Sequence, residues 1–289
     1  VRQRLDAKGK KRFLMFGEVF DGRDDLVGSF TKTDVPPQDQ LDYENQCVTD
    51  GKPLNGDQLD SVFYFPQHFQ AIRDVFQQGQ STQRIQDLWA QRPMNYGTGI
   101  PELGIGVPPA DVPINFIDNH DVPRFLNGGS VPQLHNALTF VYTAQGIPCL
   151  YYGTEQEFRG GNDPANREDL WPTEFETNGA TFQHIKKLAK VRRDSAALRK
   201  GGLNVVWASD RSADEEDAGI FAFERFGGDA GDDYVLVILN ANPNKASAPA
   251  FMGMGPTLSA ADGTQLEDML GSGRQVSVSG GSITISPPL

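Results

Sequence analysis

Acidic side chains in this sequence stand directly after short apolar runs, where chemistry could be placed. These residues, with one histidine among them, are Glu18, Asp118, His120, Asp121 and Glu155. Because the carboxyl ends of parallel strands meet on one side of a sheet, carboxylates far apart in the sequence would converge there. Paired carboxylates can cleave a glycosidic bond, one protonating the leaving oxygen and another stabilising positive charge at the anomeric carbon. The spacing alone predicts a polar cleft and leaves the reaction open, since an acid after a strand is often only a helix cap or a solvated loop residue.

Apolar runs that alternate with helical periodicity must position these side chains. The runs are residues 13–16, 61–65, 114–117 and 149–152. Helical spacing follows the second run, recurs around Trp89 and Leu138, and fills a last helix from about 181 to 199. Strands that are apolar throughout and alternate with helices indicate an α/β fold with a parallel sheet. The polar residues 21–60 are expected to form a long loop that could contain a short helix.

The pattern changes after Gly202. Short β-rich stretches at 221–226, 234–239 and 282–285 are separated by Gly, Asp and Asn turns. This change predicts an α/β domain over residues 1–201, followed by an antiparallel all-β domain over residues 202–289.

Composition narrows the classes of partner. The 26 basic and 38 acidic residues give a net charge of −12, so a nucleic acid or an anionic membrane surface would be repelled. No run of eighteen or more apolar residues is present, which argues against a transmembrane helix. The two cysteines, Cys47 and Cys149, lack the spacing of a zinc site, and two unpaired thiols are favoured over a disulfide.

Four strings in the sequence carry a family resemblance. Residues 16–20 (FGEVF), 116–121 (FIDNHD) and 146–155 (GIPCLYYGTE) resemble, in the correct order, three short regions of the α-amylase family, glycoside hydrolase family 13. Residues 160–167 (GGNDPANR) are similar to a segment of bacterial α-amylases and cyclodextrin glucanotransferases. The resemblance implies that the strands are numbers five to eight of a (β/α)₈ TIM barrel, the second half, followed by an antiparallel β-sandwich domain.

The resemblance also implies a role for individual residues. It makes Glu18 the general acid/base and Asp121 the acid that stabilises the oxocarbenium-like transition state, and His120 would hydrogen-bond the sugar in the cleavage subsite. Asp163 and Arg167 match positions that bind a more distant donor-side glucose, and Phe20 matches an acceptor-side aromatic. Asn119 and Arg124 are interpreted as structural supports. An Asp and an Arg four residues apart could also form a simple salt bridge.

Two elements of the family pattern, a barrel strand and a loop domain that should both precede Glu18, are not recognised in the sequence. The strand that should supply an Arg-x-Asp string with the nucleophile is expected upstream of Val1, so the chain is interpreted as a fragment that is inactive alone. The loop domain in which the family usually holds a structural Ca²⁺ is expected upstream as well. We therefore assign no metal or cofactor to this chain, and Ca²⁺ is expected only for the full-length parent.

Three functions stay open at this point. The first is a retaining α-amylase-type hydrolase acting on starch-like 1,4-α-glucans or maltooligosaccharides. The second is an α-glucan transglycosylase of the cyclodextrin glucanotransferase type. The third is a catalytically silent carbohydrate-binding relative, which is disfavoured because Glu18 and Asp121 are both present. The resemblance implies an extracellular location, which nothing in the sequence itself encodes.

Overall fold

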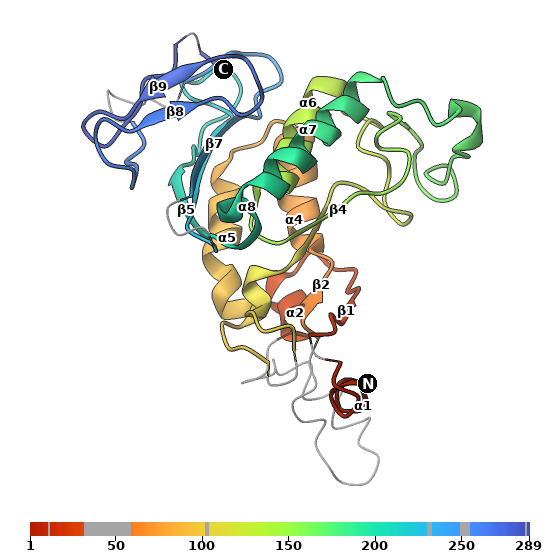
Figure 1. Ribbon diagram of the computed structural model, residues 1–289. Coiled ribbons are helices and arrows are strands. Elements are labelled where there is room, and N and C mark those ends of the chain that lie inside the picture. The colour runs from red at the N-terminus through yellow and green to blue at the C-terminus, as the bar shows by residue number, and fades with distance from the viewer. Residues whose placement is uncertain (11, 32–58, 102–103, 230–232, 249–254, 287) are drawn as a thin grey trace.

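The computed structural model describes residues 1–10, 12–31, 59–101, 104–229, 233–248, 255–286 and 288–289 (Figure 1). Its helical segments are α1 (Arg2–Asp6), α2 (Asp24–Ser29), α4 (Phe65–Gln67), the π-helix η1 (His68–Gln77), α5 (Gln83–Tyr96), the 3₁₀ segments η2 (Pro109–Asp111) and η3 (Trp171–Thr173), α6 (Val131–Thr143), α7 (Ala180–Asp194) and α8 (Ala196–Lys200). Its strands are β1 (Phe16–Gly17), β2 (Ser61–Val62), β3 (Ile114–Phe116), β4 (Ile147–Cys149), β5 (Gly202–Trp207), β6 (Ile220–Phe226), β7 (Tyr234–Asn240), β8 (Gln265–Glu267) and β9 (Gln275–Ser277).

The first four strands run parallel and lie side by side in sequence order. β1 pairs with β2 and β3 pairs with β4, both in parallel. A parallel bridge between Phe63 and Ile114 joins the two pairs, and Tyr64 N donates to Ile114 O at 2.9 Å. The parallel α/β pattern predicted from the apolar runs is therefore present, and it brings the ends of β1, β3 and β4 to the same side.

The helices cover these strands with their apolar faces. α6 begins at Ser130, whose side chain and that of Gln133 form a capping box, and it buries Leu134, Leu138 and Val141 as the spacing predicts. Ser81 Oγ accepts a hydrogen bond from Gln83 N at the start of α5. Buried residues of these helices and of β2 belong to one hydrophobic cluster, which also contains Ile117, the residue before Asp118.

The antiparallel region packs directly on the helices. β5, β6 and β7 form one antiparallel sheet, and β8 and β9 form a second pair (Figure 1). The buried Arg225 of β6 donates to Gly201 O, Gly202 O and Thr143 O, and Trp89 of α5 contacts the rings of Phe221 and Phe223. The two predicted domains, 1–201 and 202–289, therefore share one hydrophobic core, and their boundary stays a prediction.

Residues 24–29 of the predicted loop 21–60 form the helix α2, and residues 32–58 of that prediction lie outside the described residues.

Several other predicted elements differ in the structure. The apolar run 13–16 forms a strand only at Phe16–Gly17, and the run 61–65 forms one only at Ser61–Val62, because Phe65 begins α4. The last strand of the first region is Ile147–Cys149, and residues 150–152 turn away because the rings of Tyr151 and Tyr152 pack on the guanidinium of Arg124. The predicted helix 181–199 is two helices, since Ser195 is extended and caps α8 through Leu198 N. Residues 283–285 are no strand, because Gly280 and Gly281 at positive φ close a tight turn with a single bridge.

Candidate active site

Glu18 follows β1 directly. Backbone bonds from the β2 segment hold the strand: Phe63 N donates to Gly17 O at 3.0 Å, and Asp60 N donates to Met15 O at 2.8 Å. Partial burial raises the pKa of the Glu18 carboxyl above its usual range, and the negative charge of Asp121 raises it further, while His120 lowers it. A carboxyl with a raised pKa keeps its proton to higher pH, as a general acid requires.

The loop after β3 is fixed from beneath by buried polar groups. Asp118 is fully buried and accepts hydrogen bonds from Phe125 N at 3.0 Å and from Thr154 Oγ1 at 2.8 Å. Asn119 Oδ1 accepts from Asp121 N at 2.8 Å and from Val122 N at 3.1 Å. These bonds satisfy the buried backbone of the turn and direct the side chain of Asp121 outward, where it is partly exposed.

Asp121 joins residues from two loops in one charged cluster. Its Oδ2 lies 3.3 Å from His120 Nε2, and its Oδ1 lies 3.6 Å from Arg167 Nη2. Arg167 Nε in turn contacts Asp163 Oδ1 at 2.5 Å. The Asp163–Arg167 pair is thus a salt bridge, as the four-residue spacing allows, and it also reaches the Asp121 carboxylate. Of the six predicted site residues, these four and Glu18 interact as one group.

Phe20 lies beside this group on an aromatic surface. Its ring centroid is 4.7 Å from that of Phe65 and 6.0 Å from that of Phe69, yet 55% of the residue stays exposed. A ring that is supported on one face and open on the other can stack on an apolar sugar face.

Arg124 ties the loops after β3 and β4 together, as its interpretation as a support predicts. It is fully buried; its Nε donates to Glu168 Oε2 at 3.1 Å, its Nη1 donates to Tyr152 O at 2.6 Å, and its guanidinium lies 4.1 Å from the Tyr151 ring centroid.

The sequence did not reveal Asn166, which is buried and donates to Asn119 O and Val122 O. Asn166 stands inside the quoted string 160–167, but nothing in its residue type signals burial.

Replacement of Arg124 by Met should lower the free energy of unfolding by about 2–3 kcal/mol. The change removes the bonds to Glu168 and Tyr152 and leaves a carboxylate without its cation, which is costly when the pair is largely buried. Urea denaturation of the two proteins measures the difference. Arg159→Met, at an exposed arginine of the loop after β4, is the matched control and should stay within about 0.5 kcal/mol of wild type. Equal stability of Arg124→Met and wild type would contradict the supporting role.

His68 also supports the loop after β3. It is buried, its ring stacks on Phe116 with centroids 5.1 Å apart, and its Nδ1 donates to Ile117 O at 2.9 Å. Burial lowers the pKa of His68 from 6.5 to about 4. Between about pH 4 and pH 6.5 the His68 imidazole is therefore neutral in the folded protein, whereas it binds a proton in the unfolded chain.

Acid should destabilise the protein through His68. The folded pKa lies below the unfolded one, so the stabilising contribution is complete above about pH 6.5 and is lost between there and about pH 4, by roughly 3 kcal/mol in total. The test compares the free energies of unfolding of wild type and His68→Gln from pH 7.5 to pH 4. As pH falls, the advantage of wild type over His68→Gln should shrink or reverse by this amount. Val237→Ala, a buried change in β7 that leaves the contacts of His68 in place, should show a difference from wild type that is the same at each pH. A wild-type minus His68→Gln difference that does not change with pH would refute the assignment.

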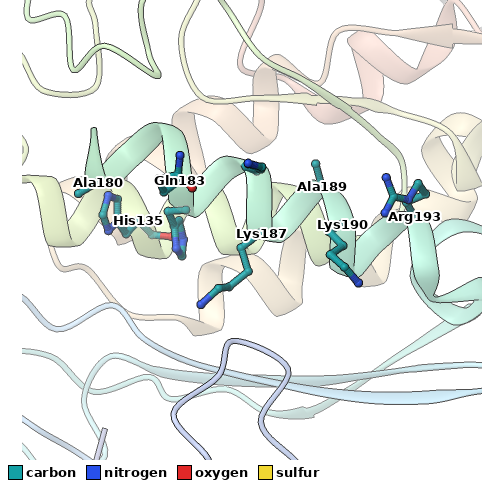
Figure 2. Close-up of a pocket in the computed structure, with 9 residues that line it drawn as sticks. His135, Ala180, Gln183, Lys187, Ala189, Lys190 and Arg193 are labelled. Atoms are coloured by element: carbon teal, nitrogen blue, oxygen red, sulfur yellow. The ribbon is translucent and has the colours of Figure 1, made fainter. Parts of the chain in front are cut away.

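A surface groove lies elsewhere, between α6 and α7 (Figure 2). It measures about 940 Å³ and is lined by His135, Ala180, Gln183, His184, Lys186, Lys187, Ala189, Lys190 and Arg193. The rings of His135 and His184 stack there with centroids 4.5 Å apart. None of the lining residues is a carboxylate or one of the predicted site residues, so this groove is not the place where an acid-catalysed reaction would occur.

No metal site accompanies the cluster in the part of the chain that the structure describes: no group of three or more His, Cys, Asp or Glu there could hold an ion. Cys149 forms no disulfide with a described residue, and Cys47 lies outside the described residues. Among the described helices, none combines the length and the apolar character needed to cross a bilayer.

Known proteins resemble the chain in sequence and in structure. It is 32% identical over 279 residues to the β/α-amylase of Paenibacillus polymyxa, covering 93% of the chain and 19% of that protein. It is 35% identical over 172 residues to the cyclomaltodextrin glucanotransferase of Thermoanaerobacterium thermosulfurigenes, covering 59% of the chain and 22% of that protein. The chain thus spans about a fifth of the curated relatives it matches. No family model matches it.

Solved structures share the fold. The α-amylase of Anoxybacillus matches 97% of the chain with a TM-score of 0.66 at 21% identity, and 51% of that structure is covered. The α-amylase of Geobacillus thermoleovorans, solved with acarbose, matches 98% of the chain with a TM-score of 0.62 at 19% identity, and 53% of it is covered. The fold is therefore that of α-amylases, over about half of their length.

These matches confirm the resemblance carried by the four strings. The chain is homologous to the amylases and cyclomaltodextrin glucanotransferases of the α-amylase family, glycoside hydrolase family 13, and it corresponds to the C-terminal half of their shared fold.

Proposed function

We propose that this chain is part of a retaining α-glucan-active enzyme of the α-amylase type, which hydrolyses starch-like 1,4-α-glucans. One observation carries the proposal: Glu18, with its raised pKa, interacts with an Asp121 carboxylate that is itself paired with His120 and Arg167. A carboxyl with a raised pKa beside a carboxylate paired with an arginine offers glycoside cleavage a proton donor and a charge-stabilising group.

The proposed roles follow from charge and position. Glu18 protonates the leaving glycosidic oxygen and later activates the incoming water. The Asp121 carboxylate, paired with Arg167, stabilises the developing positive charge, while His120 hydrogen-bonds the sugar at the cleavage point. Asp163 and Arg167 bind a donor-side glucose, and Phe20 stacks on an acceptor-side sugar. In this proposal β1 to β4 are barrel strands five to eight.

Asp121 is not proposed as the nucleophile. Its two oxygens contact a histidine and an arginine, which suits a charge-stabilising carboxylate better than one that attacks carbon. A retaining enzyme needs a nucleophilic carboxylate about 5 to 5.5 Å from the acid/base. We propose that another part of the complete protein supplies this group. The Ca²⁺ that the resemblance implies and a secreted location both stay predictions.

Transfer to a sugar acceptor is the second candidate. It is favoured by the cyclomaltodextrin glucanotransferases among the relatives and by the exposed ring of Phe20, an aromatic on which an acceptor sugar could stack. The test is to incubate the complete protein with soluble starch and to separate the products. A net gain of reducing ends with linear oligosaccharides supports hydrolysis. Cyclic products, or longer linear products formed without a gain of reducing ends, support transfer, and neither product with retained glucan binding supports a silent relative.

Residues 1–289 made alone should release no reducing sugar and should self-associate. The reaction would lack its nucleophile, and the aromatic side chains of Phe13, Phe16 and Phe20 are about half exposed around β1, which in the described residues pairs with β2 alone. An open strand edge beside exposed aromatics favours association. Size-exclusion chromatography and a reducing-sugar assay on starch test this, and a monomer with ordinary amylase turnover would contradict it.

A further inference from the structure

An exposed aromatic pair stands on the loop between β4 and α7. Trp171 is 76% exposed and Phe175 is 50% exposed, and their rings meet edge to face with centroids 5.4 Å apart. In Figure 1 this stretch of chain, green, projects to one side beyond α7. Two large rings left in water cost free energy that burial would recover, so their position needs a reason.

The loop holds these rings outward in a fixed and strained conformation. Glu174 and Phe175 have φ values of 50° and 56°, a left-handed conformation that bulky residues rarely adopt and that costs about 1–2 kcal/mol for each. Thr173 Oγ1 donates to Leu170 O at 2.8 Å and accepts from Phe175 N at 3.1 Å, and Gln156 Nε2 donates to Glu176 O at 2.8 Å. The rings are therefore presented by a structured turn.

The surroundings favour a neutral, hydroxylated ligand. The side chains of Asp169, Glu174 and Glu176 are exposed close by in the chain, which opposes an anionic ligand and supplies acceptors for hydroxyl groups. A sugar ring offers an apolar face for stacking and hydroxyls at its rim. The loop is also near the candidate site. Trp171 is four positions after Arg167, so their Cα atoms are at most about 14 Å apart.

We propose that Trp171 and Phe175 form an additional α-glucan-binding platform. One glucan molecule would occupy the active site and also stack on these rings, with glucose units beyond the one bound by Asp163 and Arg167. Long maltooligosaccharides contact the platform, whereas short ones occupy only the site around Glu18. This inference rests on the proposed function for the identity of its ligand.

The test is calorimetric titration of the complete protein, carrying Glu18→Gln to prevent turnover, with maltotriose and maltoheptaose. Trp171→Ala should weaken maltoheptaose binding about tenfold, and the maltotriose affinity should change less than twofold. Phe175→Ala should act in the same direction with a smaller effect. Met94→Ala, at an exposed apolar residue of α5, is the control and should leave both affinities unchanged.

The outcomes separate the platform from the proposed function. If the enzyme cleaves starch and Trp171→Ala binds maltoheptaose as tightly as its parent, the platform is refuted and the function stands. If maltoheptaose binding depends on Trp171 but no glucan is cleaved, the platform stands and the function is refuted. If the protein binds neither oligosaccharide, both are refuted.

Discussion

Replacing Glu18 by Gln in the complete protein should lower kcat on maltooligosaccharides by about 10²–10⁴-fold while the dissociation constant for the glucan changes little. An amide has nearly the shape of a carboxylic acid but cannot protonate the leaving oxygen, and general acid catalysis contributes an effect of this size. Glu18 is suited to the role because burial and the charge of Asp121 raise the pKa of its carboxyl.

Steady-state kinetics with maltoheptaose, and binding measured separately by calorimetry, distinguish catalysis from affinity. Glu155→Gln is the matched control, since Glu155 also follows a strand of the parallel set but has no assigned role. Its kcat should stay near that of wild type. A Glu18→Gln enzyme with near-normal turnover would remove Glu18 from the mechanism, and equal losses in both variants would show that the assay reports folding.

Replacing Asp121 by Asn should also lower kcat, by about 10²–10³-fold, because a preorganised charge beside the developing cation is lost. The same change should shift the pH dependence. The Asp121 charge helps to raise the pKa of Glu18, after the larger effect of burial, so its removal lowers that pKa. Activity that requires protonated Glu18 falls as pH rises through this pKa, and the alkaline limb of the profile should therefore move to lower pH.

The pH profile of kcat/KM for wild type and Asp121→Asn measures that movement. Asp163→Asn is the matched comparison, because it removes a carboxylate that contacts Arg167 but does not appear among the charges that shift the Glu18 pKa. It should raise KM and leave the alkaline limb in place. A limb that stays fixed or moves to higher pH in Asp121→Asn would contradict the coupling between the two acids.

Local pattern was enough to predict the parallel strands and the helices that pack on them. Continuous apolar runs marked β1 to β3, and helical spacing marked α5 and α6, because burial on one or both faces leaves a periodic trace in the sequence. The break between α7 and α8 left no such trace. It depends on Asp233, which accepts hydrogen bonds from Ser195 Oγ and Ala197 N and lies 38 residues after Ser195. Residues 282–285 show the opposite case. Their alternating polar and apolar residues predict a strand, but in the described structure no strand pairs with them.

The charged cluster was predictable only because four strings resembled a family. Position after a strand marked Glu18 and Asp121 as candidates, but spacing could not show that Arg167 reaches both Asp121 and Asp163. The buried supports were harder to foresee. Asn166 and His68 are polar residue types that usually face water, and their burial depends on partners near residue 120 that only the folded chain brings to them.

The most direct test of the account is a crystal structure of the complete protein with Glu18→Gln and bound maltoheptaose. We expect a glycosidic oxygen within about 3.2 Å of the side chain at position 18. The carboxylate of Asp121 should face the sugar ring on the donor side of that bond, and Asp163 and Arg167 should hydrogen-bond a glucose further along. A glucan bound with all of its glycosidic oxygens away from both position 18 and Asp121 would contradict the central claim that these two acids form the catalytic pair.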